Sequence, residues 1–354
     1  MSFNQYTWDL YKQTTIGIEM IKYFSDAGGY VLFKDYCPYA NFIPEDLYND
    51  WLENIYCYGV SDYDHPSSLE EAKDLYISLI TLGIRVEGQQ WLPANDFKNM
   101  LGIIQPMSYV LSQFAPEYFF PYLFLCRIFE LNKIADFFNI DLPNIPKRTD
   151  YKGRCMYYWE LCEVFYLFRK ENGLSPADLW SFLYDFAPNN LPSEKIDMPK
   201  PSQVWFIGGR LYQEDKSLES KFWQSSPETK KGDILVHYET SPISAITCIE
   251  TSLTDGVIDP LFRYYGCIYI GNRINIPHIT LKELQTDEYF FKHPLVRKNF
   301  QGVNGWSVNS ENYSELLRMI KTKGFDIEVL PKLYAPTLPK DVIIEYEHVG
   351  GAGA

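Results

Sequence analysis

The spacing of the apolar residues changes once along the chain, at a proline-rich stretch over residues 187–201 that contains four prolines and has no periodicity of its own. Before this stretch apolar residues recur every three to four positions, as helices require, and after it they alternate, as strands require. We therefore predict an α+β chain. It has a helical domain over residues 1–190, a linker over 191–201, a small β-barrel module with short helices over 202–330 and a tail over 331–354.

Two helix starts are predicted from capping residues. Ser68 is followed three positions later by Glu71, the pattern of a capping box. Ser175 precedes Pro176 and Asp178, which suit the N-cap, N1 and N3 positions. We expect further helices over residues 117–138 and 157–170, with their aromatic stripes in the core.

The charge is unevenly distributed. The whole chain carries −14, but residues 1–200 hold 16 basic against 27 acidic residues, a balance of −11, whereas residues 201–330 hold 14 against 16, a balance of −2. The first half would repel a phosphate backbone, and the second could accept a nucleic acid where its cations cluster. The helical half is therefore expected to bind a protein partner or to self-associate.

Enzyme and metal motifs are missing from the sequence. No GxSxG, Walker A, HExxH or GxGxxG pattern occurs, and the five histidines have no ligand spacing. The segment around Asp62, Asp64 and His65 has the composition of a turn. The sequence thus gives no positive case for catalysis, a metal or a cofactor.

Location can be inferred from the cysteines and the apolar stretches. Seven scattered cysteines without CxxC spacing are typical of reduced thiols in the cytoplasm. The most apolar stretch, residues 109–129, is interrupted by Pro116, Glu117, Pro121 and Arg127, which favours a buried segment over a membrane span. No secretory signal is evident at the N-terminus.

The β-rich module carries an ordered set of motifs. Trp205 lies in a first strand, an aromatic segment around Trp223 precedes the turn Lys-Lys-Gly-Asp at 230–233, and the next strand ends in Tyr238. The segment Ile-Asn-Ile-Pro-His-Ile-Thr-Leu-Lys-Glu-Leu follows at 274–284. This order resembles the EVE-type domains of the PUA-like superfamily, which are related to YTH and ASCH modules. The resemblance covers about the last third of the chain.

The resemblance implies a barrel whose aromatic pocket holds a nucleobase, often a modified one, of DNA or RNA. Stacking on aromatic rings contributes about 1–3 kcal/mol per base, which offsets the cost of unstacking. The candidate ligand-binding residues are Trp205, Trp223, Ser225, Tyr238, Ser241, Asn304 and Trp306. Domains of this class often occur in defence against foreign DNA, which is an association by family.

The most basic stretch of the module supplies candidate phosphate contacts. Lys292, Arg297 and Lys298 lie beside glycines and aromatics, a composition that suits a backbone track next to a base pocket. Two alternatives remain open at this point. One is metal-independent RNA cleavage of the ASCH type by His237, His293 or Lys298, and the other is an interaction scaffold whose barrel is purely structural.

Overall fold

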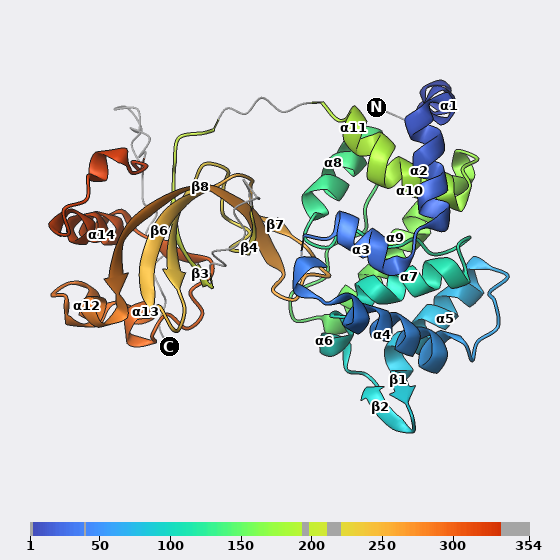
Figure 1. Cartoon of the computed structure of the whole chain (residues 1–354), viewed down its shortest axis with the longest axis horizontal. Helices are drawn as coiled ribbons and strands as arrows, with labels where there is room; N and C mark the ends of the chain where they lie inside the picture. The colour runs from blue at the N-terminus through green and yellow to red at the C-terminus, as the bar shows by residue number, and fades with distance from the viewer. Residues whose placement is uncertain (1–2, 39, 193–197, 211–220, 334–354) are drawn as a thin grey trace, which may run out of the picture. The chain divides into compact units, whose positions relative to one another are not determined.

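The computed structural model describes residues 3–38, 40–192, 198–210 and 221–333, and they form an α+β protein with a helical N-terminal part and a mixed β-sheet in the C-terminal part (Figure 1). The chain divides into two compact units. Unit 1 comprises residues 1–197, 221–228 and 255–269, and unit 2 comprises 198–220, 229–254 and 270–354. None of the described helices is both long and apolar enough to cross a bilayer.

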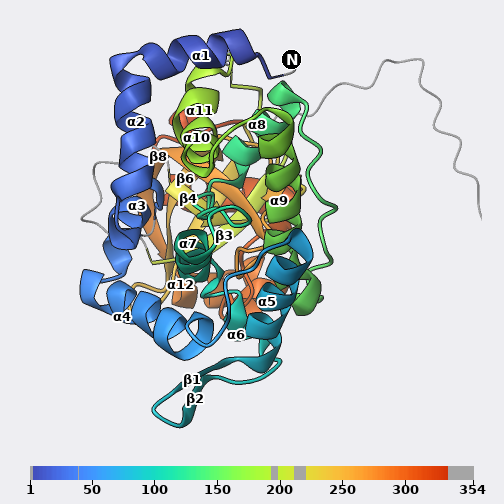
Figure 2. The ribbon, with the colours of Figure 1, turned by 90° about the vertical axis from the view of Figure 1, so that its right-hand side faces the viewer.

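Unit 1 is built from helices around a buried central one. Its helices are α1 (Gln5–Gln13), α2 (Thr15–Asp26), α3 (Gly29–Tyr36), α4 (Glu45–Ile55), the π-helix η2 (Tyr56–Val60), α5 (Leu69–Leu82), α6 (Phe97–Met100), α7 (Ile104–Phe114), α8 (Ile128–Phe138), α9 (Tyr151–Glu171), α10 (Pro176–Ser181), the π-helix η3 (Phe182–Phe186) and α11 (Ala187–Asn190). A hairpin of β1 (Ile84–Val86) and β2 (Gln89–Leu92) follows α5. Eight of the eleven residues of α7 are buried, and the helix lies in the middle of the unit (Figure 2).

Both predicted helix starts are confirmed. The Ser68 hydroxyl accepts from the backbone N–H of Glu71, although the Glu71 carboxylate returns to Ser67 instead of closing the capping box on Ser68. The Ser175 side chain and Asp178 form a complete capping box. Helix α9 begins at Tyr151, earlier than predicted, where Asp150 caps it.

The predicted helix over residues 117–138 is wrong in its first half, since α8 begins only at Ile128. The preceding segment is not helical, because Pro121 interrupts it and Cys126 has a φ of +63°, and residues 119–124 within it are buried. Side-chain hydroxyls replace the helical hydrogen bonds. The Ser108 hydroxyl accepts from the N–H of Tyr122 at 2.7 Å, and the Tyr184 hydroxyl accepts from the N–H of Leu123 at 3.1 Å. The Tyr158 hydroxyl donates to the carbonyl of Phe120 at 2.8 Å. A buried non-helical segment needs such partners.

Unit 1 also takes two segments from beyond the proline-rich stretch. Residues 221–228 include β4 (Lys221–Gln224), and residues 255–269 include β7 (Val257–Ile258). Phe222, Leu261, Phe262 and Cys267 join the hydrophobic core of the helices. The sequence after residue 201 is therefore shared between two cores.

The C-terminal part of the chain contains a curled mixed sheet, of which β3, β5, β6, β9 and residues 270–280 of β8 belong to unit 2. The strands run in the order β4–β8–β6–β5–β3–β9, with β7 paired to β8. Their bounds are β3 (Val204–Gly209), β5 (Ile234–Glu239), β6 (Ala245–Ser252), β8 (Gly266–Thr280) and β9 (Trp306–Val308). β3 and β5 are parallel, whereas β3 and β9, β5 and β6, β6 and β8, and β7 and β8 are antiparallel. β8 is a single strand of 15 residues.

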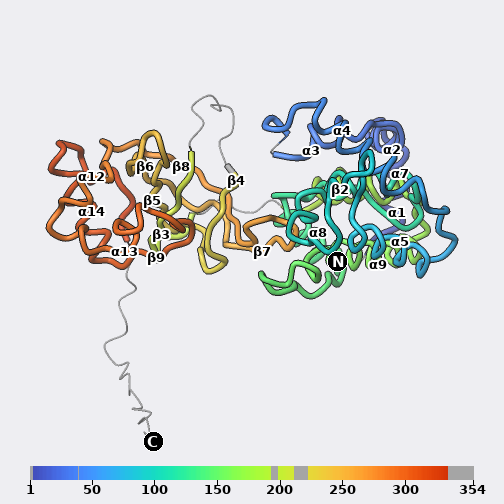
Figure 3. The backbone as a smooth tube through the Cα atoms, turned by 90° about the horizontal axis from the view of Figure 1, so that it is seen from below, coloured from blue at the N-terminus to red at the C-terminus, as the bar shows by residue number. Residues whose placement is uncertain are grey.

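The two faces of this sheet differ. Helices α12 (Leu281–Thr286), α13 (Pro294–Arg297) and α14 (Ser310–Thr322) lie to one side of it (Figure 1 and Figure 3). Val204, Phe206, Ile234, Val236 and Tyr238 form a hydrophobic core with residues of these helices. Because side chains alternate along a strand, Trp205, Ile207, Leu235 and His237 point to the opposite face.

Candidate functional site

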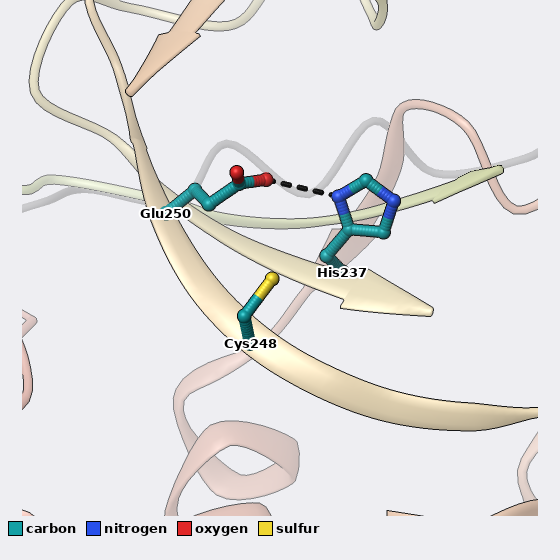
Figure 4. A group of neighbouring side chains, drawn as sticks. All are labelled: His237, Cys248 and Glu250. Carbon is teal, nitrogen blue, oxygen red and sulfur yellow. Dashed lines mark hydrogen bonds and ion pairs between the residues drawn. The ribbon is translucent and has the colours of Figure 1, made fainter. Parts of the chain in front are cut away.

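A buried polar cluster lies on the sheet face opposite the helices of unit 2. His237 comes from β5, and Cys248 and Glu250 come from β6, where they are two residues apart and therefore share a face. His237 and Cys248 are paired in the antiparallel register. All three side chains are buried, and one potential ligand atom from each lies within 4.8 Å of the others (Figure 4).

Glu250 is the centre of this cluster. Its Oε2 lies 2.9 Å from His237 Nδ1, and its Oε1 lies 2.7 Å from both Nε and Nη2 of Arg273, which extends from β8. Burial opposes ionisation of Glu250, but the hydrogen bonds and charges of His237 and Arg273 outweigh it and lower the pKa of the carboxyl group. Glu250 is therefore an ionised carboxylate held between an imidazole and a guanidinium.

Cys248 is a poor nucleophile in this setting. Burial, with the nearby Glu250 charge, raises the pKa of its thiol to about 12. His237 is not placed to activate the thiol as a base. Its Nδ1 is bonded to Glu250, and its Nε2 points away from Cys248 (Figure 4). A protonated thiol does not supply the thiolate that nucleophilic catalysis requires.

His237, Cys248 and Glu250 also offer the donor types of a metal site. Imidazole, thiolate and carboxylate are the usual ligands of Zn²⁺. Here both oxygens of Glu250 are already engaged, Oε1 by Arg273 and Oε2 by His237. A metal ion would have to share this carboxylate with a guanidinium cation, so the donor set fits a metal poorly.

Trp205 is fixed on the same face by a second buried carboxylate. Its indole Nε1 donates to Asp233 Oδ2 at 2.9 Å. Asp233 also accepts from the Ser202 hydroxyl and from the backbone N–H groups of Gln203 and Lys230. The Lys-Lys-Gly-Asp turn thus organises the starts of β3 and β5, and its aspartate sets the orientation of Trp205.

The predicted ligand-binding residues are not brought together as one set. Trp205 is on the Glu250 face, whereas Tyr238 belongs to the helix-covered core, where its ring stacks on Phe300 at 4.0 Å. Trp306 pairs with Phe206 in the sheet register and packs against the helix-covered core. Asn304 accepts from the N–H of Gly208 at 2.8 Å.

The remaining predicted residues lie elsewhere. Trp223, which is half-buried, and Ser225, which is buried, belong to unit 1. Ser241 is exposed in the turn between β5 and β6. Of the histidines considered for RNA cleavage, His237 is on the Glu250 face. His293 packs near Phe206 and Trp306, with ring centroids 6.0 and 6.3 Å apart, on the helix-covered face.

The three predicted phosphate contacts are all exposed. Lys292 lies in the short helix η4 (Phe290–Lys292), Arg297 ends α13, and Lys298 is its C-cap. Lys292 Nζ lies 5.1 Å from the centroid of the Phe291 ring. Among the residues that the structure describes, none of the three cations is in an ion pair.

Cys248, Glu250 and Arg273 were not singled out from the sequence. Their signal is a two-residue period on neighbouring strands, which puts Leu235 and His237 beside Cys248 and Glu250. Which residues of β6 and β8 lie opposite each other could not be predicted from the sequence, because the pairing of these strands is irregular and a simple alternation does not give its register. None of the seven cysteines, all of which are described, forms a disulfide bond.

The chain matches no protein-family model and no curated protein. Two solved structures align with about a third of it. One is a protein of Rhodopseudomonas palustris determined by NMR, with 14% identity, 34% of this chain and 94% of that chain covered, and a TM-score of 0.30. The other is a hypothetical protein of Leishmania major, with 11% identity, 35% and 98% covered, and a TM-score of 0.29. Neither score is high enough to establish a shared fold.

Proposed function

We propose that unit 2 binds a nucleobase of DNA or RNA, in a PUA-like module that reads the base through the Glu250 cluster. Lys292, Arg297 and Lys298, on the helix-covered side of the sheet, contact phosphates elsewhere along the same nucleic-acid strand. The observation that carries this proposal is the arrangement of Arg273. Its Nε and Nη2 are held by the buried carboxylate of Glu250 at 2.7 Å, yet 30% of its side chain is exposed. A guanidinium fixed at one edge presents its other edge in a defined orientation.

This arrangement suits the edge of a base. Guanidinium groups donate in pairs to the acceptors of a purine, and a good bidentate contact contributes about 1–3 kcal/mol of discrimination. Among the described residues, the hydrogen bonds of Arg273 go to Glu250 through Nε and Nη2, so Nη1 is available to a ligand. Because Glu250 stays ionised, it holds the guanidinium without a ligand being present, and less entropy is lost on binding.

The basic stretch supports the phosphate part of the proposal. It is followed by Asn299 and Phe300, both with positive φ of 51° and 59°. The Phe300 ring is nevertheless buried and stacks on Tyr238. A bulky residue at positive φ is sustained only where packing holds it. Arg297 and Lys298 are therefore presented by an anchored loop, which favours contact with a polyanion.

Neither alternative function is favoured by a specific observation. His237 and His293 lie on opposite faces of the sheet, so they do not form a common acid–base pair for RNA cleavage. Arg273 with its exposed edge is not needed by a barrel that serves only as a scaffold.

The test is fluorescence polarisation with labelled single- and double-stranded oligonucleotides, with and without modified cytosine or adenine. Arg273→Gln should weaken binding about tenfold or more and reduce discrimination between bases. The matched control is Arg318→Gln, which removes an exposed arginine of α14 that pairs with Asp287 and Glu315. If the two variants bind alike, or if no oligonucleotide binds at low salt, the proposal fails.

A second experiment separates phosphate contacts from base contacts. The variant with Lys292, Arg297 and Lys298 all changed to Gln should weaken binding to all sequences by a similar factor. It should also reduce the slope of log K against log salt by roughly 2–3. Changing Lys282 and Lys321 to Gln provides the control for a loss of positive charge elsewhere in the unit. A salt slope that stays unchanged would assign the phosphate contacts to other residues.

A further inference from the structure

Unit 1 contains a pocket of about 330 Å³ between α7 and the junction of α4 with η2. Its walls are mainly aromatic and apolar, and comprise Leu52, Tyr56, Tyr109, Val110 and Phe114. His65 and Gln113 supply the polar side chains of the lining. The pocket is at the lower end of the size range of small-molecule sites, so it can hold a head group or one side chain.

His65 is held in place by two contacts with Phe114. The rings stack with their centroids 4.1 Å apart and their planes 15° apart. His65 Nδ1 lies 2.9 Å from the Phe114 carbonyl oxygen. A carbonyl accepts and cannot donate, so Nδ1 must carry the proton of this bond. In the neutral imidazole, Nε2 is then a hydrogen-bond acceptor of fixed position.

The elements that supply the pocket lining carry acidic residues and no lysine or arginine. Helix α4 carries Glu45, Asp46, Asp50 and Glu53 and has no lysine or arginine. The loop that leads to His65 adds Asp62 and Asp64, and helix α7 is uncharged. All six carboxylates are exposed, and within the described part of the chain none of them forms an ion pair. Their combined field attracts a cation to this side of the unit.

Unit 1 uses tyrosine rings to hold its own cations elsewhere. The Arg127 guanidinium lies 5.6 Å from the ring centroid of Tyr36, and Arg169 and Lys170 both lie over Tyr166. Among the described residues, no cation lies over Tyr56, Tyr109 or Phe114. Tyr56 is 49% exposed, so its side chain is accessible to a ligand.

We propose that this pocket binds the head group of an organic cation that carries N–H donors, a guanidinium or an ammonium. The aromatic rings attract the cation through their faces. His65 Nε2 accepts one of its N–H groups, and the six carboxylates draw it to the pocket. This site is independent of the base-binding proposal, because it is formed entirely by residues of unit 1.

Calorimetric titration of the whole protein tests the site with a pair of matched peptides. Acetyl-Gly-Arg-Gly-amide carries the guanidinium, and the same peptide with citrulline in place of arginine is a neutral analogue of almost the same shape. The arginine peptide should bind saturably, at least fivefold more tightly than the citrulline peptide, and more weakly as salt is raised. Equal binding of the two peptides would overturn the proposal.

Two tyrosines of η2 provide the matched variants. Tyr56→Ala removes a wall of the pocket and should weaken the arginine peptide about fivefold. Tyr58→Ala removes a tyrosine that is similarly exposed, at 40%, but does not line the pocket, and it should leave binding unchanged. If both variants lose affinity equally, or if neither does, the cation is not bound in this pocket.

The source of the cation follows from a further comparison. L-Arginine amide and the arginine peptide share a head group, and only the peptide can add contacts outside the pocket. Tighter binding of the peptide by fivefold or more would assign the site to a side chain of a basic polypeptide. Equal affinity for both would assign it to a small cationic metabolite. Failure of both ligands to bind would overturn the proposal and leave the base-binding hypothesis of unit 2 untouched.

Discussion

Arg154 Nη2 donates to the backbone carbonyl of Phe262 at 2.7 Å, across 108 residues of sequence. The same buried guanidinium donates through Nε to the carbonyl of Pro260 at 2.7 Å and through Nη1 to that of Arg148 at 2.9 Å. It therefore connects helix α9 to the segment 255–269, which the chain contributes to unit 1 from its second half. The hydroxyl groups of Tyr265 and Tyr269 add hydrogen bonds from this segment to the carbonyls of Pro146 and Cys126.

We expect Arg154→Met to loosen this segment, because the change leaves buried carbonyl groups without donors. The loss in the free energy of unfolding of unit 1 should be about 3 kcal/mol. Amide hydrogen exchange should accelerate most over residues 255–265. Arg148→Met is the control, since the Arg148 side chain is exposed and only its backbone carbonyl is used. Equal exchange in both variants would contradict the anchoring role.

Asp259 should make unit 1 less stable as the pH rises. Burial raises the pKa of its carboxyl to about 6, despite hydrogen bonds from the N–H groups of Leu261, Cys126 and Phe262. In the unfolded chain the pKa is close to 3.9. The folded state therefore binds the proton more tightly, so the stabilising effect of protonation is complete below about pH 4 and is lost as the pH rises to about 6. At neutral pH the ionised Asp259 lowers the free energy of unfolding of unit 1 by about 3 kcal/mol.

The variant Asp259→Asn isolates this effect. Its Oδ1 can still accept from the N–H groups of Leu261 and Phe262. The melting temperature of the variant, relative to that of the parent protein, should increase between pH 4 and pH 7. Above pH 7 this difference should stay constant. Melting temperatures measured at half-unit steps of pH provide the test. A constant difference across this range would show that Asp259 keeps an ordinary carboxyl pKa.

The sequence predicted the elements whose signals are local. Ser175 and Asp178 determine a helix start through contacts three residues apart, and strands were predicted around Trp205 and up to Tyr238, where β3 and β5 lie. The extended segment before α8 could not be predicted, because its stability depends on hydroxyl groups of Ser108, Tyr158 and Tyr184, distant in sequence. Apolar composition alone cannot distinguish such a segment from a buried helix.

The candidate site was predicted less well than the fold for a related reason. Aromatic residues were selected by type, yet Trp205 and Tyr238 point to opposite faces of the sheet. The face of each follows from register, which depends on pairing between distant strands. Glu250 and Arg273 were overlooked because a lone glutamate and a lone arginine carry no motif. Their role depends on the burial of Glu250 and on the ion pair between the two side chains.

Glu250→Gln should destabilise unit 2 at neutral pH and have less effect in acid. The pKa of Glu250 is lowered by His237 and Arg273, so its contribution is present above the ordinary carboxyl pKa and is lost as the pH falls through the folded value. We expect a loss of about 3 kcal/mol at pH 7, since a buried imidazole and a guanidinium lose their shared anion. Glu288→Gln, at an exposed position, is the control. A loss that does not shrink below pH 4 would contradict this account.

Asp233 should be the most sensitive position at the start of the sheet. Its Oδ2 accepts from the indole N–H of Trp205 and from the N–H of Lys230, at 2.9 and 2.8 Å. In Asp233→Asn the new amide group would oppose one or both of these donors, at a cost of about 1–3 kcal/mol for each donor left unsatisfied. Trp205→Phe removes the indole N–H and with it one hydrogen bond to Asp233, but it leaves the bond from Lys230 to Asp233 intact. It therefore measures the contribution of the Trp205–Asp233 bond alone. Urea unfolding combined with hydrogen exchange over residues 203–209 should show a larger loss for Asp233→Asn than for Trp205→Phe. The opposite ranking would mean that Trp205 stabilises the sheet through packing of its ring, and that the turn aspartate has little part in it.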